Sequence, residues 1–269
     1  MFRKILVLSA IVVLLFASST PAQAISYGEF DDNGHPNVGS IVVRLEGELY
    51  QWCSGTLISP TVFLTASHCT APLDGVVAAN PSAEVLVTFD PSISAEGTFY
   101  TGDWFTNPNY GQGHGYSDPG DVAVIVLDEA PDGIIPASLP TAGLLDELKA
   151  QHILGEVLFT AVGYGTVRDT NHGGWQPIMD NVDRNRADQE FLSLTNAWLT
   201  NSMNFATGNG GTCYGDSGGP HFIHLDGIES NIVASVTVTG DAQCKATDKT
   251  YRVDTASARS FLGEFVTLP

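Results

Sequence analysis

Short apolar segments separated by turn residues recur along this 269-residue chain, and their spacing constrains the fold more than any other feature. Turn sequences such as Asp-Asn-Gly at 32–34, Asn-Pro-Asn at 107–109 and Asp-Pro-Gly at 118–120 separate them. Short strands at such spacing are typical of sandwiches and barrels, so the sequence predicts an all-β fold. The segments with strand composition are 40–45, 55–58, 62–65, 84–89, 122–127, 156–162 and 231–238.

Two stretches have a helical pattern, 144–150 and 256–266, and the second follows a cap at Asp254 or Thr255. The segment 130–140 is rich in proline and small residues and is the best linker between two halves. We expect one half over about 25–130, a linker over about 131–150, a second half over about 151–255 and a closing helix over about 256–266.

Residues 1–24 have the pattern of a secretory signal peptide. A basic start precedes the apolar run 5–17, and Ala22-Gln23-Ala24 supplies the small residues expected before a cleavage site after Ala24. A membrane anchor is the alternative, but the run is shorter than the ~20 apolar residues that span a bilayer. The mature chain is therefore predicted to be secreted, extracellular and without a membrane anchor.

The charge balance excludes two classes of partner. The chain has 30 acidic and 11 basic residues, a formal net charge of −19. Nucleic acids and anionic membrane surfaces would be repelled by this charge. We interpret the excess of acids as a source of solubility outside the cell.

The chain contains four cysteines, Cys53, Cys69, Cys213 and Cys244. An even number in a secreted protein predicts two disulfides, which can be arranged in three ways. A zinc site is the alternative, but the sequence contains no Cys-x-x-Cys pair.

The segment 211–220, Gly-Thr-Cys-Tyr-Gly-Asp-Ser-Gly-Gly-Pro, surrounds Ser217 with glycines. Glycines let the backbone turn sharply and let two N–H groups converge on one point, as an oxyanion requires. The same residues fit the Gly-x-Ser-x-Gly elbow of α/β-hydrolases, which needs a following helix and a histidine well after the serine. Only His221 and His224 follow Ser217, and Pro220 opposes a helix, so we reject that alternative.

Two earlier residues complete a candidate catalytic group. His68 precedes a cysteine predicted to be disulfide-bonded, which would keep a general base aligned. Asp121 opens an apolar strand, so it is expected to be partly buried and to need a partner such as an imidazole. Asp118 reads as a turn residue and Asp128 as a surface acid, and both remain weaker alternatives.

Four motifs in this order resemble the chymotrypsin-like (trypsin-fold) serine proteases: 53–59 (Cys-Ser-Gly-Thr-Leu-Ile-Ser), 64–69 (Leu-Thr-Ala-Ser-His-Cys), 121–127 (Asp-Val-Ala-Val-Ile-Val-Leu) and 215–220 (Gly-Asp-Ser-Gly-Gly-Pro). Minor matches are 107–110 and 163–165, and the resemblance covers the mature chain. It implies two packed six-stranded antiparallel β-barrels, a cleft between them and a C-terminal helix. It also implies the disulfides Cys53–Cys69 and Cys213–Cys244.

The resemblance implies a secreted serine endopeptidase acting through an acyl-enzyme. Ser217 would be the nucleophile, His68 the general base and Asp121 the residue that orients His68, while the N–H groups of Gly215 and Ser217 would bind the oxyanion. No metal or organic cofactor is expected. Protein or peptide substrates and protein inhibitors are the expected partners, and the chain is expected to be a monomer.

The resemblance also implies activation by a new N-terminus. Ile25 stands where the family has the residue whose ammonium pairs with the acid before the nucleophile, here Asp216. Because Ala24 rather than Arg or Lys precedes Ile25, we expect signal peptidase itself to make the active form, without a propeptide.

Specificity depends on residues around the pocket. Gly211 stands where trypsin-like relatives have an acid, which argues against a preference for Arg or Lys. Val238 and Thr239 fall on the pocket wall beside Thr237, and Thr239 would favour small apolar side chains. An inward Asp248 would restore a basic preference, and Lys249 lies near the same wall.

Two other functions stay open on the sequence. A catalytically silent homologue could bind a partner through the same cleft, although such proteins usually lose a member of the triad. An esterase would use the same chemistry, and only cleavage of a protein substrate would distinguish the two.

Overall fold

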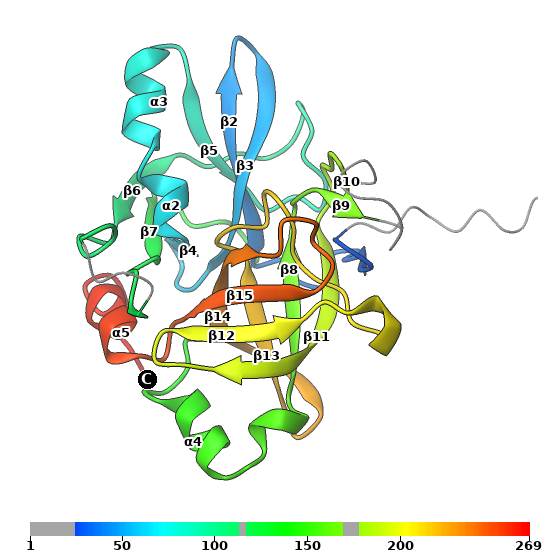
Figure 1. Ribbon diagram of the computed structural model, residues 1–269. Coiled ribbons are helices and arrows are strands. Elements are labelled where there is room, and N and C mark those ends of the chain that lie inside the picture. Colours follow the sequence, from blue (N-terminus) through cyan, green and yellow to red (C-terminus); the bar gives the residue numbers. More distant parts are fainter. Residues whose placement is uncertain (1–24, 113–116, 169–177) are drawn as a thin grey trace, which may run out of the picture.

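The structure is a computed structural model that describes residues 25–112, 117–168 and 178–269. The predicted signal peptide, 1–24, lies outside these residues. Two curved antiparallel sheets pack together, with short helices at their margins (Figure 1). Within the described ranges no helix has the length and apolar character needed to cross a bilayer.

The first sheet is built from residues 38–127. Its six strands curl until Val87 of β5 forms an isolated bridge with Tyr100, just before β6. Its edge strands therefore meet at a single bridge instead of a full ladder. The strand order is β5 (Glu84–Thr88), β2 (Val38–Leu45), β3 (Glu48–Leu57), β4 (Val62–Thr65), β7 (Ala123–Leu127) and β6 (Gly102–Thr106).

The second sheet closes into a barrel because its edge strand β8 pairs with both β13 and β11. The two-residue strand β1 adds to the outside of β11 and brings the N-terminal segment onto this barrel. The strand order is β1 (Glu29–Phe30), β11 (Asn185–Leu194), β12 (Trp198–Ser202), β15 (Thr247–Arg252), β14 (Ile228–Gly240), β13 (Pro220–Leu225) and β8 (Leu158–Gly163). A separate pair joins β9 (Val167–Arg168) to β10 (Ile178–Met179).

The predicted all-β class is confirmed, and so is the helix α4 (Leu144–Ala150). The closing helix α5 (Ala256–Leu262) begins where expected, with the Thr255 hydroxyl accepting from the Ala258 amide at 3.2 Å, but Gly263 ends it before residue 266. Neither α2 (Ser67–Thr70) nor α3 (Leu73–Ala79) was predicted from the sequence. Two short 3₁₀ turns, η2 (Leu154–Glu156) and η3 (Phe205–Thr207), complete the elements.

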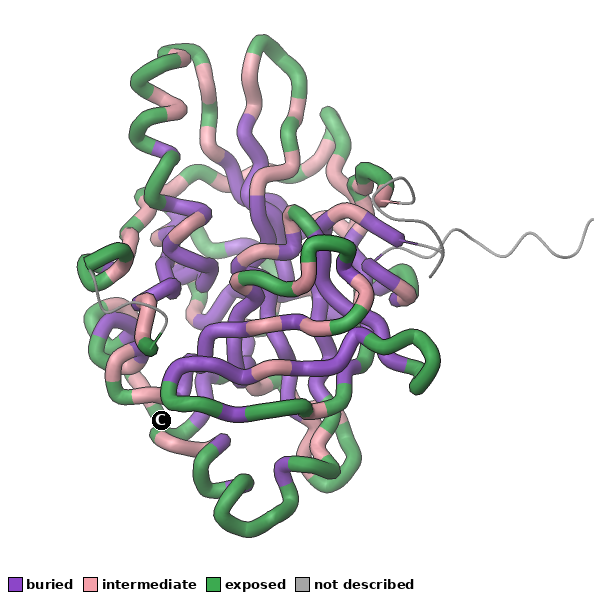
Figure 2. The backbone as a smooth tube through the Cα atoms, viewed as in Figure 1, coloured by how far each residue is buried: buried purple, intermediate pink, exposed green. Residues whose placement is uncertain are grey.

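One hydrophobic cluster joins the two sheets. Leu64 and Val124 from the first sheet pack in it with Phe222 and Val236 from the second, all fully or almost fully buried. Figure 2 shows the buried backbone running through the strands of both sheets, with exposed residues mainly at the loops and helices. This shared core fixes the sheets relative to each other, which a site between them requires.

A buried arginine also spans the junction. Arg184 is fully buried, and its Nε donates to Asp31 Oδ2 at 2.8 Å. One of its terminal nitrogens donates to the carbonyls of Val38, at the start of β2, and Phe89, just after β5, at 3.0 and 2.9 Å. The guanidinium therefore holds together segments that lie far apart in the sequence.

His35 extends this charged network. Its Nδ1 contacts Asp31 and its Nε2 lies 2.7 Å from Glu229 Oε1. Burial alone would lower the pKa of His35, but the hydrogen bonds with Asp31 and Glu229 raise it to about 9. Burial would likewise raise the pKa of Asp31, but its bond to His35 lowers it to about 2. Both groups are therefore charged at neutral pH.

We predict that Arg184→Met lowers the free energy of unfolding by about 3–5 kcal/mol, because it leaves Asp31 and two carbonyls buried without this partner. Arg186→Met is the control, since Arg186 pairs with Glu29 on the surface and such pairs contribute about 0–1 kcal/mol. Urea unfolding of both variants measures the difference. Equal losses in the two variants would contradict the importance of the buried network.

Candidate active site

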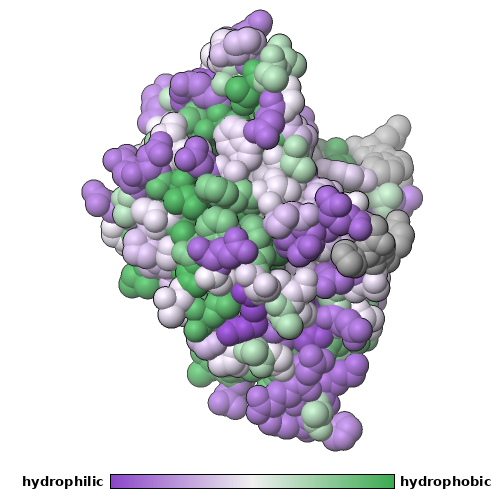
Figure 3. Space-filling view, turned by 90° about the vertical axis from the view of Figure 1, so that its left-hand side faces the viewer, coloured by the Kyte–Doolittle hydropathy of each residue, from purple (hydrophilic) through white to green (hydrophobic). Residues whose placement is uncertain are grey.

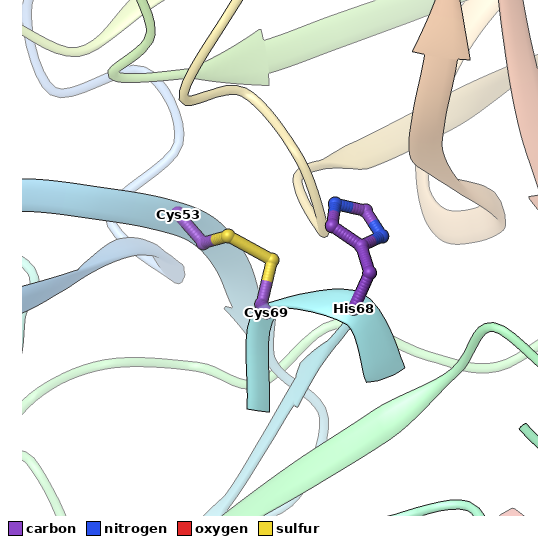
Figure 4. Close-up of side chains that lie close together, drawn as sticks. All are labelled: Cys53, His68 and Cys69. Carbon is purple, nitrogen blue, oxygen red and sulfur yellow. A yellow bond between two sulfur atoms is a disulfide. The ribbon is translucent and has the colours of Figure 1, made fainter. Parts of the chain in front are cut away.

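His68 lies on the short helix α2, directly after β4. The disulfide Cys53–Cys69 ties this helix to β3, and the His68 ring extends away from the two sulfur atoms (Figure 4). Cys53, His68 and Cys69 bring potential ligand atoms together, but the disulfide has consumed both thiolates that a metal would need. The disulfide therefore serves to hold the helix that carries the imidazole.

Asp121 holds His68 at two points. One carboxylate oxygen accepts the His68 backbone N–H at 2.9 Å, and the other lies 2.9 Å from the ring Nδ1. The Ser67 hydroxyl donates to the Val122 carbonyl at 2.8 Å, which fastens the adjoining loop to the same helix. With the Nδ1 proton directed to the buried carboxylate, Nε2 is left as the proton acceptor.

The two alternative acids are engaged elsewhere. Asp118 accepts a hydrogen bond from the Tyr251 hydroxyl at 2.7 Å, and Asp128 accepts from the Thr101 hydroxyl at 2.5 Å. Among the three candidate acids, Asp121 is the one whose carboxylate contacts His68.

Ser217 is half-buried in the turn that precedes β13. Its carbonyl accepts from the backbone N–H of Ser54 on β3 at 2.8 Å, so the first sheet positions a residue of the second half. Within the described ranges, no hydrogen bond joins the Ser217 hydroxyl to His68. Such bonds are often long in unliganded sites and shorten when substrate binds.

Two peptide N–H groups at this turn are available to a ligand. The Tyr214 carbonyl accepts from the Thr166 N–H at 2.7 Å, which turns the N–H of Gly215 in the opposite direction. The Asp216 carbonyl accepts from the Gly219 N–H at 2.8 Å, which does the same for the N–H of Ser217. Neither N–H donates to another described residue, so both remain free to bind an oxyanion.

Gly215 needs its missing side chain. Its φ is +94°, in the left-handed region, and a Cβ there would lie 2.3 Å from Gln51 Oε1. Its carbonyl accepts from Gln51 Nε2 at 2.8 Å and from the Ser54 hydroxyl at 3.1 Å. Gln51, Ser54 and Thr166 support this turn from far away in the sequence, and no motif marks the first or last of them.

Asp216 is a fully buried carboxylate without a cation among the described residues. It accepts from the backbone N–H groups of Gly165, at 2.7 Å, and Cys213, at 2.8 Å. Burial nevertheless raises its pKa to about 7. Ile25 is also fully buried. The next residue, Ser26, forms a β-bridge with Gly211, which precedes Asp216 by five residues, but no ion pair joins Ile25 to Asp216. In the full chain the Ile25 nitrogen is an amide and carries no charge.

A hollow of about 290 Å³ opens beside Ser217. Thr237, Val238 and Thr239, which the sequence analysis expected at a specificity pocket, are among its lining residues, and the buried Thr237 hydroxyl has no hydrogen-bond partner among the described residues. The second disulfide, Cys213–Cys244, borders it, so both implied disulfides are confirmed. The other lining residues are Thr212, Tyr214, Gly215, Gly240, Asp241 and Ala242.

Gly211 is not on the wall of this hollow. A Cβ at Gly211 would lie 2.1 Å from Gln189 Nε2, so the glutamine amide fills the space beside it. The same amide donates to Asp248 Oδ2 at 2.9 Å, and His221 Nε2 lies 2.9 Å from that oxygen. Asp248 is therefore paired inside the barrel, while the Lys249 ammonium lies 4.4 Å from the centre of the Trp198 ring.

A larger hollow, of about 680 Å³, lies away from these residues, between β6 and α5. Figure 3 views the side of the molecule on which α3, β6 and α5 lie, and apolar surface gathers in its centre. None of the candidate catalytic residues lines this hollow, so its size alone does not make it the reactive site. Its lining residues are Asp74, Asp103, Trp104, Phe105, Thr106, Pro108, Phe261, Glu264 and Phe265.

Comparisons with known proteins agree with this geometry. The family model described as Trypsin matches residues 29–261. The protein named brachyurin from Leptuca pugilator is 28% identical over 199 residues, which cover 70% of this chain and 77% of that protein. A solved structure of HL collagenase is 19% identical, has a TM-score of 0.59 and covers 91% of this chain and 96% of its own; it supports the fold alone.

We predict that Gly215→Ala slows the reaction of Ser217 with a fluorophosphonate by about 10²-fold, because the methyl group displaces a turn whose N–H is expected to bind the oxyanion. Gly208→Ala is the matched control: its φ is +84°, but a Cβ there meets no atom within 4 Å. Both variants should lose about 1–2 kcal/mol of stability. Intact-mass spectrometry measures the labelling rate of each variant. Equal rates for Gly215→Ala and Gly208→Ala would contradict this role for Gly215.

Proposed function

Because this chain belongs to the trypsin family of chymotrypsin-like serine proteases, we propose that it is a secreted serine endopeptidase acting through Ser217, His68 and Asp121. The observation that carries this proposal is the double contact of the Asp121 carboxylate with the backbone and ring of His68. The His68–Asp121 pair lies beside the glycine-rich turn around Ser217, in which two N–H groups remain free.

In the proposed mechanism, His68 Nε2 removes the hydroxyl proton of Ser217 as its oxygen attacks the substrate carbonyl. The negative charge that develops on the carbonyl oxygen is stabilised by the N–H groups of Gly215 and Ser217. His68 then delivers the proton to the leaving amine, and water hydrolyses the acyl-enzyme by the same steps. Asp121 stabilises the imidazolium and keeps its ring oriented.

We predict that Ser217→Ala abolishes labelling by a fluorophosphonate and cleavage of a protein substrate. Asp121→Asn should fold but lose about 10⁴-fold in kcat, because an amide no longer favours the reactive tautomer of His68. Retained folding is checked by circular dichroism. A wild-type protein of the expected mass that takes no label would instead favour a silent homologue, and labelling without proteolysis would favour an esterase.

The proposed specificity is for small apolar side chains. Val238 and Thr239 narrow the hollow, and the carboxylate of its one acidic lining residue, Asp241, accepts the backbone N–H groups of Lys245, Ala246 and Thr247. Asp248, the acid that could attract Arg or Lys, is already paired with Gln189 and His221.

We predict that Thr239→Gly shifts cleavage toward larger side chains, because it widens the hollow beside Ser217. A peptide panel that varies the residue before the cut measures kcat/KM for wild type and variant. Wild-type cleavage confined to Arg and Lys would refute the proposed preference.

Activation is proposed to follow removal of residues 1–24 by signal peptidase. Cleavage after Ala24 would turn the Ile25 amide into an ammonium. In the uncleaved chain Asp216 has no such cation as a partner among the described residues. The raised pKa of Asp216 reflects the free energy needed to bury its charged form without a cation. Pairing with the new ammonium would offset this free energy and hold the neighbouring turn in place.

We predict different stability profiles for two Ser217→Ala chains, one beginning at Ile25 and one retaining Ala22-Gln23-Ala24. With Asp216 unpaired, its pKa of about 7 lies above the ordinary 3.8, so the retained chain loses stability as pH rises from about 4 to about 8. The trimmed chain should keep its stability until its ammonium, with an unperturbed pKa of ~8, loses its proton. Urea unfolding across pH measures both, and Asp216→Asn should remove the difference; identical profiles would contradict the pairing.

A further inference from the structure

Three side chains of metal-binding type meet on the second barrel, apart from the catalytic residues. Asp188, His224 and Glu229 lie on β11, β13 and β14 of one closed sheet, in which β13 pairs with β14 and β8 lies between β13 and β11 (Figure 1). One ligand atom from each lies within 4.8 Å of the other two. We propose that these three side chains bind a zinc ion, a site that goes beyond the proposed peptidase activity.

The distances suit a small cation. His224 Nε2 lies 3.9 Å from Asp188 Oδ1 and 3.9 Å from Glu229 Oε2. The third side of the triangle is no longer than 4.8 Å, so a point equidistant from the three atoms is at most about 2.5 Å from each. Shifts of up to about 0.4 Å inward reach the 2.0–2.2 Å of zinc–nitrogen and zinc–oxygen bonds. Side-chain rotations can provide such shifts without moving the strands.

The threonine beneath the cluster supplies a further oxygen. Thr160 on β8 has its hydroxyl 2.8 Å from both Asp188 Oδ1 and His224 Nε2. This fully buried hydroxyl therefore stands at the inner side of the triangle of ligand atoms. On the outer side, Asp188 is 55% exposed, which leaves an entry path and a position for water.

Glu229 is oriented by a contact behind the cluster. His35 Nε2 lies 2.7 Å from Glu229 Oε1, so the carboxylate has one oxygen fixed toward the N-terminal segment and the other facing His224. His35 is itself fixed by Asp31 and, through it, by the buried Arg184. Such second contacts orient ligands and raise metal affinity.

The donor set selects the kind of cation. Calcium and magnesium prefer cages made of oxygen alone, whereas an imidazole nitrogen with carboxylates suits zinc. Because the ligands come from three strands of the barrel, with Thr160 on a fourth, the ion would brace that barrel. Its expected effect is on stability and not on turnover, since Ser217, His68 and Asp121 take no part in the cluster.

The test uses the chain beginning at Ile25 with Ser217→Ala, which prevents self-digestion, after removal of metal by a chelator. Zinc chloride alone is titrated by calorimetry, and thermal unfolding is measured with and without zinc. We expect one equivalent to bind and to raise Tm by about 5 °C. His224→Gln and Glu229→Gln should each weaken binding at least tenfold and remove the shift.

Each variant serves as its own metal-free reference, so a variant that is merely less stable still reports on zinc. His152→Gln and Asp226→Asn are the controls, because both residues are exposed and neither belongs to the cluster; Asp226 lies in the turn between β13 and β14. These controls should keep both the affinity and the Tm shift. Absence of binding by the parent chain, stabilisation by calcium but not zinc, or a shift that persists in either ligand variant would overturn the proposal. These outcomes do not depend on peptidase activity.

Discussion

Ser54 on β3 connects the two halves of the site. Its backbone N–H donates to the Ser217 carbonyl at 2.8 Å, and its hydroxyl donates to the Gly215 carbonyl at 3.1 Å. The same hydroxyl accepts from the Tyr164 N–H at 3.0 Å. His68 and Asp121 lie beside strands of the first sheet and Ser217 lies in the second half, so these hydrogen bonds hold the residues of the proposed triad in place relative to one another.

Buried charges organise the rest of the molecule, and their partners differ in kind. Arg184 is neutralised by a carboxylate and solvated by carbonyls, and Asp248 receives a glutamine amide and lies against an imidazole. Asp216 has two backbone N–H donors but no described cation, and its pKa is raised. A buried charge without a countercharge costs free energy, so the proposed ammonium of Ile25 would stabilise Asp216.

Local sequence patterns predicted the parts of the site that depend on adjacent residues. The motifs predicted a glycine-rich turn at Ser217 and a disulfide-bonded cysteine next to His68, and α4 was predicted to its last residue. Four-residue α2 escaped prediction because it is too short to show a helical period. Gln51 escaped for another reason: its contact with Gly215 spans 164 positions, and no local pattern encodes such a distance.

The sequence by itself determined the all-β class, the family and the residues that could carry the chemistry, because strand spacing, cysteine number and glycine-rich turns are local properties. Only the tertiary structure decided which groups meet. It distinguished Asp121 from Asp118 and Asp128, paired Asp248 within the barrel and brought Asp188, His224 and Glu229 together. The physical reason is that burial and hydrogen bonding depend on all the strands that surround a side chain, and these come together only when the two sheets pack.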